Sequence, residues 1–521
     1  MARSRLFSSL RRSFLLALGA SRRGVDPVSH AEETQALWRQ SRRDFMRRTA
    51  MAGAALTLGA RLPLAGCDGD GSTSKDLTIG IVGAGMAGLM CARTLEKAGL
   101  RATLFEGQNR VGGRMWTARE GFSDGQLIEL GGELIDTEHG LLRGLAVELG
   151  LTLDDFLEVD KDVDADRLYF DGDVLDDAAL LTAWGPLAQK IRADALASES
   201  SEAELARLDA LSIADYLDAV NGLDPMLRKV LDLAYVGEYG LEVDQQSALN
   251  LIWMAAEGET DAFSIYGTSD ERFHTHLGND SFPTAVAAAL SSTIELGHRL
   301  VAVKTLSDGR HRLTFDRGGT SVEAVFDHVV FTLPWTTLRA VTFDPPLPAD
   351  KASMIAQLGY GTNAKLMLQF NTRVWRTQHG SSGSTFCNNG PQTLWETSRG
   401  QAGQSGILTV FTGGAEGLAV GNGTAEARAQ AYLGPIDAIY PGTKAAYRKD
   451  SAVRMHWPSF EWMKGSYACY LPGQAAWNGT EGEPVGTLHF AGEHTSADFQ
   501  GYMEGAAESG IRAAQEILGV K

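Results

Sequence analysis

Three glycines near residue 85 have the type and spacing that can hold a phosphate group. Gly83, Gly85 and Gly88 form G-x-G-x-x-G directly after the apolar run 77–82. A strand that ends in such a turn lets backbone N–H groups approach a pyrophosphate, and the next helix points its N-terminus at the charge. Glu106 ends a second apolar run eighteen residues after Gly88, where a carboxylate can bind a ribose diol. The stretch therefore predicts a dinucleotide site.

The residues that come next indicate which dinucleotide is bound. The strand, helix and strand expected within 77–105 are stronger evidence than the glycines alone, but they do not separate NAD from FAD. Arg110, Gly112, Gly113 and Arg114 then form R-x-G-G-R, which offers guanidinium groups and open backbone N–H groups to a pyrophosphate. This segment resembles the FAD-dependent amine oxidase superfamily, which includes flavin-containing monoamine oxidases. The resemblance implies FAD as the cofactor.

The same resemblance assigns cofactor contacts further along the chain. F-A-G-E-H-T-S and G-Y-M-E-G-A, which begin at Phe490 and Gly501, match the family in order and spacing. They imply that Glu493 bonds the ribityl or pyrophosphate part of FAD. They also imply that a helix beginning at Met503 stabilises negative charge at the flavin N1–C2=O edge. Val301 corresponds to the position whose backbone holds the adenine, although an ordinary buried strand valine predicts the same sequence.

Four side chains are candidates for catalysis. Lys365 begins an apolar strand, and by resemblance it reaches flavin N5 through a water, where a cation helps oxygen to accept electrons. Tyr467 and Tyr502 resemble the two rings that flank a flat, neutral amine in monoamine oxidases, and Trp457 matches another flavin-lining aromatic. The alternatives are a lysine that extends its charge to solvent and three aromatic side chains of the core.

Two departures from the family bear on the flavin bond and the substrate. Ser466 stands where mitochondrial monoamine oxidases have the cysteine that bonds the flavin, so we expect non-covalent FAD, and Cys469 is not a substitute. α-Amino acid oxidases often carry an arginine just after a loop with two adjacent glycines, which are Gly131 and Gly132 in this chain. Here that place holds Glu133 and Leu134. That favours amines over amino acids. We interpret Glu133 as a solvated loop carboxylate, with a partner role for the distal ammonium of a diamine as the alternative.

Composition limits the class of partner. The chain of 521 residues is long enough for about two domains, and its 44% hydrophobic and 21% charged residues are ordinary for a globular protein. Residues 1–66 hold twelve arginines and four acids, which is a net charge of +8. Because the whole chain has a net charge of -18, the remaining residues carry -26. We expect no nucleic-acid partner for that acidic part. Four cysteines without short paired spacing argue against a disulfide scaffold and a zinc site, so no metal is expected.

The N-terminal region resembles an export signal. S-R-R-D-F-M at 41–46 is similar to a twin-arginine motif, and the apolar run that follows is short and interrupted by Arg61. L-A-G-C ends at Cys67 and is similar to a bacterial lipobox. We therefore expect export of the folded protein by the twin-arginine route to the periplasm, with membrane attachment only through a lipid on Cys67. A homodimer is compatible with the sequence.

The expected fold class is α/β, with a Rossmann-like FAD-binding domain of the GR2 type and an interleaved α+β substrate-binding domain. Residues 1–75 are expected to be the signal and a flexible tether. The other boundaries are 76–150, 266–335 and 451–521 for the FAD-binding domain, and 151–265, mostly helical, and 336–450 for the substrate domain. The acidic cluster at 160–166 is expected to be a solvated loop.

The function implied is oxidation of an amine to an imine by hydride transfer to flavin N5. The imine then hydrolyses to an aldehyde and ammonia, and O2 is reduced to H2O2. One alternative is an L-amino acid oxidase on the same fold, and another is an amine dehydrogenase that passes electrons to a periplasmic carrier. A non-catalytic flavoprotein scaffold is a further alternative, but it has no need of Lys365 with both tyrosines.

Overall fold

The computed structural model describes residues 77–175, 177–257 and 265–520, so the export motif and Cys67 lie outside the described residues. Its first layer is a parallel sheet of five strands in the order β22-β13-β1-β2-β9. These strands are β1 (Ile79–Val82), β2 (Ala102–Phe105), β9 (Thr293–Glu295), β13 (His328–Phe331) and β22 (Leu488–Phe490). Three distant stretches of chain thus build one sheet, as the Rossmann-like expectation requires.

Both faces of the parallel sheet are covered. All four residues of β1 are buried, because a parallel strand between two others has no exposed face. Helices α3 (Met86–Lys97) and α18 (Met503–Ile517) pack against each other, with α4 (Gly140–Leu149) and α11 (Ser281–Ala289) beside them. The opposite face packs against a four-stranded sheet, where Phe105 stacks on Phe315 with ring centroids 4.2 Å apart. That sheet has the order β12-β11-β10-β14, made by β10 (Arg299–Thr305), β11 (His311–Arg317), β12 (Thr320–Phe326) and β14 (Thr342–Asp344).

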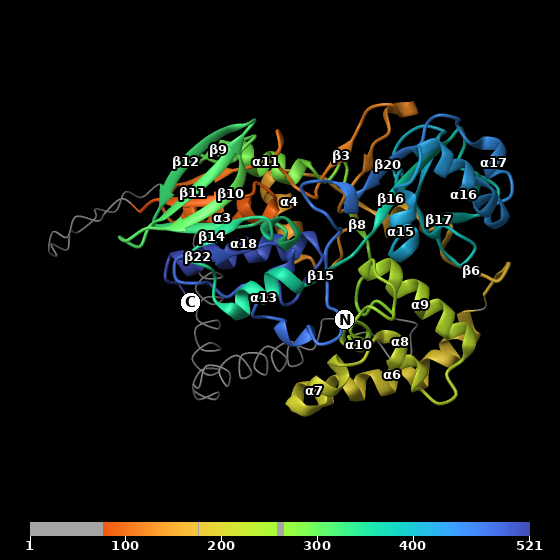
Figure 1. Ribbon diagram of the computed structural model, residues 1–521. Coiled ribbons are helices and arrows are strands. Elements are labelled where there is room, and N and C mark those ends of the chain that lie inside the picture. The colour runs from red at the N-terminus through yellow and green to blue at the C-terminus, as the bar shows by residue number, and fades with distance from the viewer. Residues whose placement is uncertain (1–76, 176, 258–264, 521) are drawn as a thin grey trace, which may run out of the picture.

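A mixed sheet of seven strands forms the second half of the molecule (Figure 1). Its central strand β16 (Ala364–Phe370) is buried along its whole length. Leu366 and Leu368 pack into a core with α16 (Ala425–Ile439), whereas Met367 packs on the opposite face. Because side chains alternate along a strand, Lys365 shares the face of Met367. The order is β20 (Val453–His456), β16, β19 (Gly406–Thr412), β18 (Gln392–Glu396), β17 (Ser381–Cys387), β6 (Asp164–Phe170) and β7 (Asp173–Val174).

A group of helices adjoins the seven-stranded sheet and appears below it in Figure 1. These are α6 (Asp177–Ser200), α7 (Glu202–Asp209), α8 (Ile213–Asp218), α9 (Pro225–Tyr239) and α10 (Ala248–Ala256). Helix α9 shows why the sequence forms a helix here, since Asp224 caps its first N–H groups, Pro225 follows at the first turn and Gly240 ends it with left-handed φ. The remaining elements are β3 (Thr117–Ala118), β4 (Ile128–Glu129), β5 (Leu153–Asp155), β8 (Phe273–Thr275), β15 (Gly359–Tyr360), β21 (Ala468–Cys469), α5 (Phe156–Val159), α12 (Trp335–Leu338), α13 (Ala349–Gln357), α14 (Val374–Thr377), α15 (Gly414–Val420) and α17 (Thr443–Ala446).

The acidic cluster at 160–166 is largely exposed, as expected, but it is not only a loop. Its last residues begin β6, which pairs in parallel with β17. Asp160 accepts a hydrogen bond from Arg376 at 2.6 Å and another from Arg399 at 3.3 Å. The contacts of Asp160 were not predicted, because both cations lie more than 200 residues away along the chain.

The domain boundaries stay predictions, but strand pairing bears on two of them. β14 pairs with β10, so the chain is still in the nucleotide-binding half at Asp344. β20 pairs with β16, so the seven-stranded sheet continues to His456. Within the described residues, none of the helices combines the length and hydropathy that a bilayer crossing requires.

We predict that Gly88→Ala disrupts the nucleotide-binding half. A Cβ at Gly88 would lie 2.0 Å from the carbonyl oxygen of Gly83, and a backbone atom cannot rotate away from it. We expect a loss of about 3 kcal/mol or more in the free energy of unfolding, measured by urea denaturation. Gly144→Ala is the control, since Gly144 has no atom within 4 Å of an added Cβ. An equally stable Gly88→Ala protein would contradict the packing described.

Candidate active site

A cavity of about 520 Å³ lies between the parallel sheet, the seven-stranded sheet and the start of α18. This volume is in the usual range for a site that takes a cofactor or a small molecule. The turn after β1 and Glu106 line this cavity together with Lys365, Tyr467 and Tyr502. The sequence motifs therefore meet at a single cavity.

The turn after β1 leaves open space where a diphosphate would lie. Gly83 has φ of +109°, which a side chain would strain, and its Cβ would meet Thr332. Gly85 is different, because the nearest atom to an added Cβ is the Cα of Gly113 at 4.0 Å. Gly85 and Gly113 thus present bare backbone to the cavity from two directions, as a pyrophosphate site requires.

Glu106 is held in place at the end of β2. Its Oε2 accepts the N–H of Ala84 at 2.9 Å, and its Oε1 accepts the N–H of Gln108 at 2.9 Å. Burial raises the pKa of Glu106 above its ordinary value in spite of these hydrogen bonds. The carboxylate is therefore fixed at the edge of the cavity, where it can bind a ribose.

The two arginines of R-x-G-G-R have different surroundings. Arg110 lies 3.9 Å over the ring of Trp116 and donates to the carbonyl of Gly113 at 2.6 Å. Burial lowers the pKa of Arg110 to about 10. Arg110 thus braces the double-glycine turn from within. Arg114 lines the cavity and donates to the carboxylate of Glu493 at 2.6 Å.

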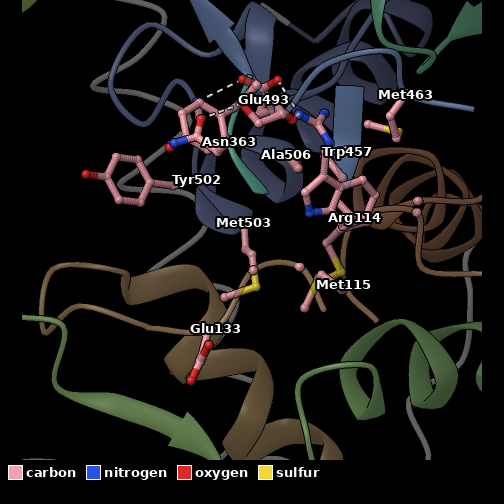
Figure 2. Close-up of a pocket in the computed structure, with 18 of the residues that line it drawn as sticks. Arg114, Met115, Glu133, Asn363, Trp457, Met463, Glu493, Tyr502, Met503 and Ala506 are labelled. Atoms are coloured by element: carbon pink, nitrogen blue, oxygen red, sulfur yellow. Dashed lines mark hydrogen bonds and ion pairs between the residues drawn. The ribbon is translucent and has the colours of Figure 1, made fainter. Parts of the chain in front are cut away.

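The N-terminus of α18 faces the cavity. Met503 is the first helical residue, and Tyr502 at the N-cap makes no side-chain hydrogen bond to the first turn. Glu493 accepts the N–H of Gly501 at 2.8 Å, which fixes the approach to the helix. Figure 2 shows Glu493 with Arg114 at one wall, and Tyr502 and Trp457 on opposite sides of Met503. The free N–H groups and helix dipole can stabilise an anion at this point.

Val301 lies in an irregular part of β10, and the contact of its backbone with the adenine stays a prediction. The side chain is 37% exposed, and the residues of this strand that line the cavity are its neighbours Arg299 and Leu300. The register of β10 against β11 shifts between Leu300 and Ala302, so Val301 falls in an irregularity of the strand. A simple strand alternation could not reveal this shift.

Lys365 and Glu133 form a buried ion pair. Lys365 Nζ lies 2.7 Å from Glu133 Oε2, and both residues are less than 10% exposed. Our interpretation of Glu133 as a solvated loop carboxylate was therefore wrong. Burial acts to raise the pKa of Glu133, but the charge and hydrogen bond of Lys365 outweigh it and hold the pKa below its ordinary value.

The three aromatic candidates all line the cavity. Tyr467 OH donates to the carbonyl of Gly237 at 3.4 Å, and an added Cβ at Gly501 would lie 3.8 Å from its ring, so Tyr467 adjoins the segment that carries Tyr502. Trp457 Nε1 donates to the carbonyl of Leu130 at 3.1 Å. The two tyrosines thus lie on adjoining segments, and Trp457 packs on the Gly131-Gly132 loop.

Sequence reasoning missed a set of carboxylates beside Tyr502. Glu238, at the end of α9, accepts a hydrogen bond from Tyr502 OH at 3.2 Å. Burial, with the charge of Asp136, raises the pKa of Glu238 to about 7. Burial and the charges of Asp136 and Glu238 raise the pKa of Glu271 to about 8, although its side chain faces the open cavity. No sequence signal marks these acids, because three separate segments supply them.

The cavity also has an arginine in its wall, Arg399, although no arginine follows directly after the Gly131-Gly132 loop. Arg399 lies 4.1 Å over the ring of Phe156, and its Nη1 donates to Asp160 at 3.3 Å. Its Nε is buried with no hydrogen-bond partner among the described residues. A neighbouring guanidinium, Arg272, is bound by both oxygens of Asp155.

The residues fit FAD. Bare backbone at Gly85 and Gly113 suits the diphosphate, Glu106 suits a ribose and the α18 N-terminus suits an electron-rich ring edge. All of these features line the same cavity, which continues to the two tyrosines. A nicotinamide dinucleotide would not account for the R-x-G-G-R segment at 110–114.

Comparisons with known proteins agree with this geometry. The sequence profile described as flavin containing amine oxidoreductase matches residues 86–518. An L-amino acid dehydrogenase of Synechocystis is 27% identical over 483 residues, covering 84% of this chain and 94% of the relative. AofH of Mycobacterium tuberculosis, provisionally named a flavin-containing monoamine oxidase, is 28% identical over 84% of this chain and 95% of its own. Putrescine oxidase bound to putrescine shares the fold with a TM-score of 0.73 at 24% identity, covering 85% of this chain and 99% of that one.

The chain belongs to the flavin containing amine oxidoreductase family. It is an FAD-dependent oxidoreductase with the expected two-part α/β fold.

We predict that the protein becomes less stable as the pH rises from about 5 to about 8. The folded-state pKa values of Glu238 and Glu271 are raised to about 7 and about 8, so folding favours their protonated forms. That contribution is complete below the unfolded pKa and is lost as the pH rises through the folded values. Urea midpoints measured across this range should fall.

Glu238→Gln and Glu271→Gln should flatten this pH dependence, because neither amide titrates. Glu323→Gln, an exposed carboxylate on β12 that is remote from the cavity, serves as the control and should retain the wild-type slope. Parallel slopes for all the proteins would show that the two cavity acids are ionised in the folded protein throughout.

Proposed function

We propose that the protein oxidises primary amines that arrive as cations and returns the electrons to O2. The observation that carries this proposal is the carboxylate lining beside Tyr502. Glu238 and Glu271 face the cavity with no cation within ion-pair distance in the described residues. A bound ammonium group stabilises the ionised forms of these two acids, whose pKa values are raised in its absence, whereas a carboxylate would oppose their ionisation.

FAD, when bound, supplies the two-electron acceptor to which the α-hydrogen passes as a hydride. The protein's own part is to bind, align and deprotonate the amine. Tyr467 and Tyr502 would restrict the amine to one plane, since their rings line the cavity from adjoining segments. Glu238 Oε1 is placed to take up the ammonium proton, because its pKa of about 7 suits an acceptor near neutral pH. Water then adds to the imine and yields an aldehyde and ammonia.

We also propose that FAD is bound without a covalent link. Ser466 lines the cavity and donates its hydroxyl to Asn363 Oδ1 at 2.6 Å. Cys469 is fully buried beside Asn250, and burial raises the pKa of its thiol. A neutral, enclosed thiol is a poor nucleophile, which supports non-covalent binding.

Export to the periplasm and a lipid on Cys67 remain part of the proposal. They rest on the motifs at 41–46 and 64–67. Twin-arginine export of a folded protein suits an enzyme that acquires FAD before it crosses the membrane.

An L-amino acid substrate is the second candidate. The relative from Synechocystis bears the name of an L-amino acid dehydrogenase, and Arg399 offers a guanidinium in the cavity wall. Asp160 already neutralises part of that charge, and Glu238 and Glu271 line the same cavity. This balance of charge favours amines.

Anaerobic mixing with amines and L-amino acids tests the proposal. We expect primary amines to bleach the visible absorbance of the bound FAD, and admission of air to restore it. Bleaching by α-amino acids alone would move the assignment to the second candidate. Bleaching without recovery in air would contradict O2 as the acceptor and indicate a dehydrogenase.

We predict that Tyr467→Ala lowers kcat/KM for the best amine by about 100-fold, because the amine loses one of the two surfaces that align it. The ratio of FAD to protein should not change. Tyr467→Phe is the control and should stay within about threefold of wild type, since its ring is intact. Loss of FAD from Tyr467→Ala would show that the ring has a structural role.

A further inference from the structure

The ammonium group of Lys365 has no donor left for a water. Its Nζ contacts Glu133 Oε2 at 2.7 Å, the carbonyl oxygen of Gly131 at 2.8 Å and that of Glu129 at 3.2 Å. A lysine ammonium has three N–H donors, and these three acceptors occupy them all. The arrangement differs from a lysine that holds a reacting water, as the family resemblance implied.

Glu133 is equally well fixed. Its Oε1 accepts the indole N–H of Trp395 at 2.9 Å, while Oε2 binds Lys365. The Lys365 ammonium also lies 5.2 Å from the centre of the Trp395 ring. Trp395 on β18 therefore holds the carboxylate beside the strand that carries the lysine.

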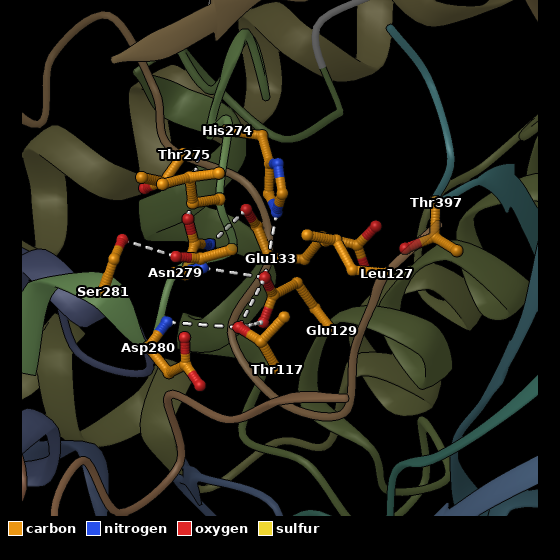
Figure 3. A network of polar contacts seen from close by, with 12 residues as sticks. Thr117, Leu127, Glu129, Glu133, His274, Thr275, Asn279, Asp280, Ser281 and Thr397 are labelled. Atoms are coloured by element: carbon orange, nitrogen blue, oxygen red, sulfur yellow. Dashed lines mark hydrogen bonds and ion pairs between the residues drawn. The ribbon is translucent and has the colours of Figure 1, made fainter. Parts of the chain in front are cut away.

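The loop that carries Glu133 is anchored from the other side by a buried polar network (Figure 3). Asn279 Nδ2 donates to the carbonyl oxygens of Gly132 at 3.1 Å and Glu133 at 2.6 Å. The Glu129 carboxylate accepts the N–H of Asn279 at 2.8 Å and lies 3.0 Å from His274 Nε2. Both members of the ion pair are thus fixed by elements from two halves of the molecule.

We propose that Glu133 is a positioning residue that fixes Lys365 and cancels its charge, and thereby restrains the delivery of electrons to O2. The ion pair of Lys365 and Glu133 lines the same cavity as Trp457 and Met503, so it faces the cofactor site. A net cation there would stabilise the negative charge that O2 gains with its first electron. A neutral pair supplies only a dipole.

The inference rests on the proposed function, because O2 is the acceptor in both. In the balanced reaction, the amine gives up two electrons and one proton as a hydride, plus a second proton from nitrogen. O2 takes up two electrons and two protons and becomes H2O2. Glu133 changes neither balance and acts only on the rate of the oxygen step.

The test reduces the FAD-loaded protein with dithionite and then mixes it with O2, so that no amine is needed. We expect Glu133→Gln to reoxidise about tenfold faster, because the ammonium charge is no longer cancelled. Lys365→Met should reoxidise about tenfold more slowly, because it leaves a buried anion. The double variant should return to within about threefold of wild type, because it is neutral again.

The reduction potential of the bound FAD is the second readout. It should rise in Glu133→Gln, fall in Lys365→Met and return in the double variant. Glu396→Gln is the matched control. It breaks the buried ion pair between Glu396, on β18 of the same sheet, and Arg373, and this pair lies away from the cavity. It should change neither the rate nor the potential.

Three results would overturn the proposal. They are a slower Glu133→Gln, a double variant no faster than Lys365→Met, and potentials that do not move. Glu133→Asp guards against failure to fold, since it keeps the charge, and a tenfold change in its rate would also contradict the proposal. Failure of the proposed function is distinct, because it would appear as FAD that no amine reduces while the dithionite experiment still gives its result.

Discussion

Close contact between backbones around the cofactor turn is the constraint on which the rest of the structure depends. An added Cβ would lie 2.0 Å from Gly83 O at Gly88, 1.7 Å from Arg114 O at Gly131 and 2.1 Å from Ala87 O at Gly510. At these positions the turn after β1, the Gly131-Gly132 loop and α18 each contact neighbouring backbone directly, with no side chain between them. The backbone of the turn after β1 and of the Gly131-Gly132 loop therefore reaches the cavity, and the charged residues described above also line it.

The ion pair of Lys365 and Glu133 connects this nucleotide-binding half to the seven-stranded sheet. A buried ion pair adds little stability by itself, because desolvation offsets the attraction, but removal of one partner leaves a costly charge. The pair is thus better understood as a device that fixes two surfaces at one distance. Glu238 makes a similar connection from the helical group, through its hydrogen bond with Tyr502.

Local patterns predicted much of this structure, and long-range partners account for the rest. The strand, turn and helix at Ile79–Lys97 and the helix from Met503 follow from apolar periodicity and glycine spacing, which are local. The burial of Glu133 was missed because Lys365 lies 232 residues away, and the contact of Glu238 with Tyr502 spans 264 residues. The irregularity of β10 at Val301 was not predicted, because it leaves no mark in the residue pattern.

The order of strands in the parallel sheet has a consequence for how the chain acquires its fold. β22 and α18 lie near the end of the described residues, yet β22 completes the sheet edge beside β13, and α18 packs on α3 near their start. Pairings so distant in sequence form slowly, because a long loop must close before any contact compensates for it. The wall of the cavity that α18 supplies is therefore absent until residues 503–517 have left the ribosome. Cofactor capture accordingly depends on the docking of α18 against α3.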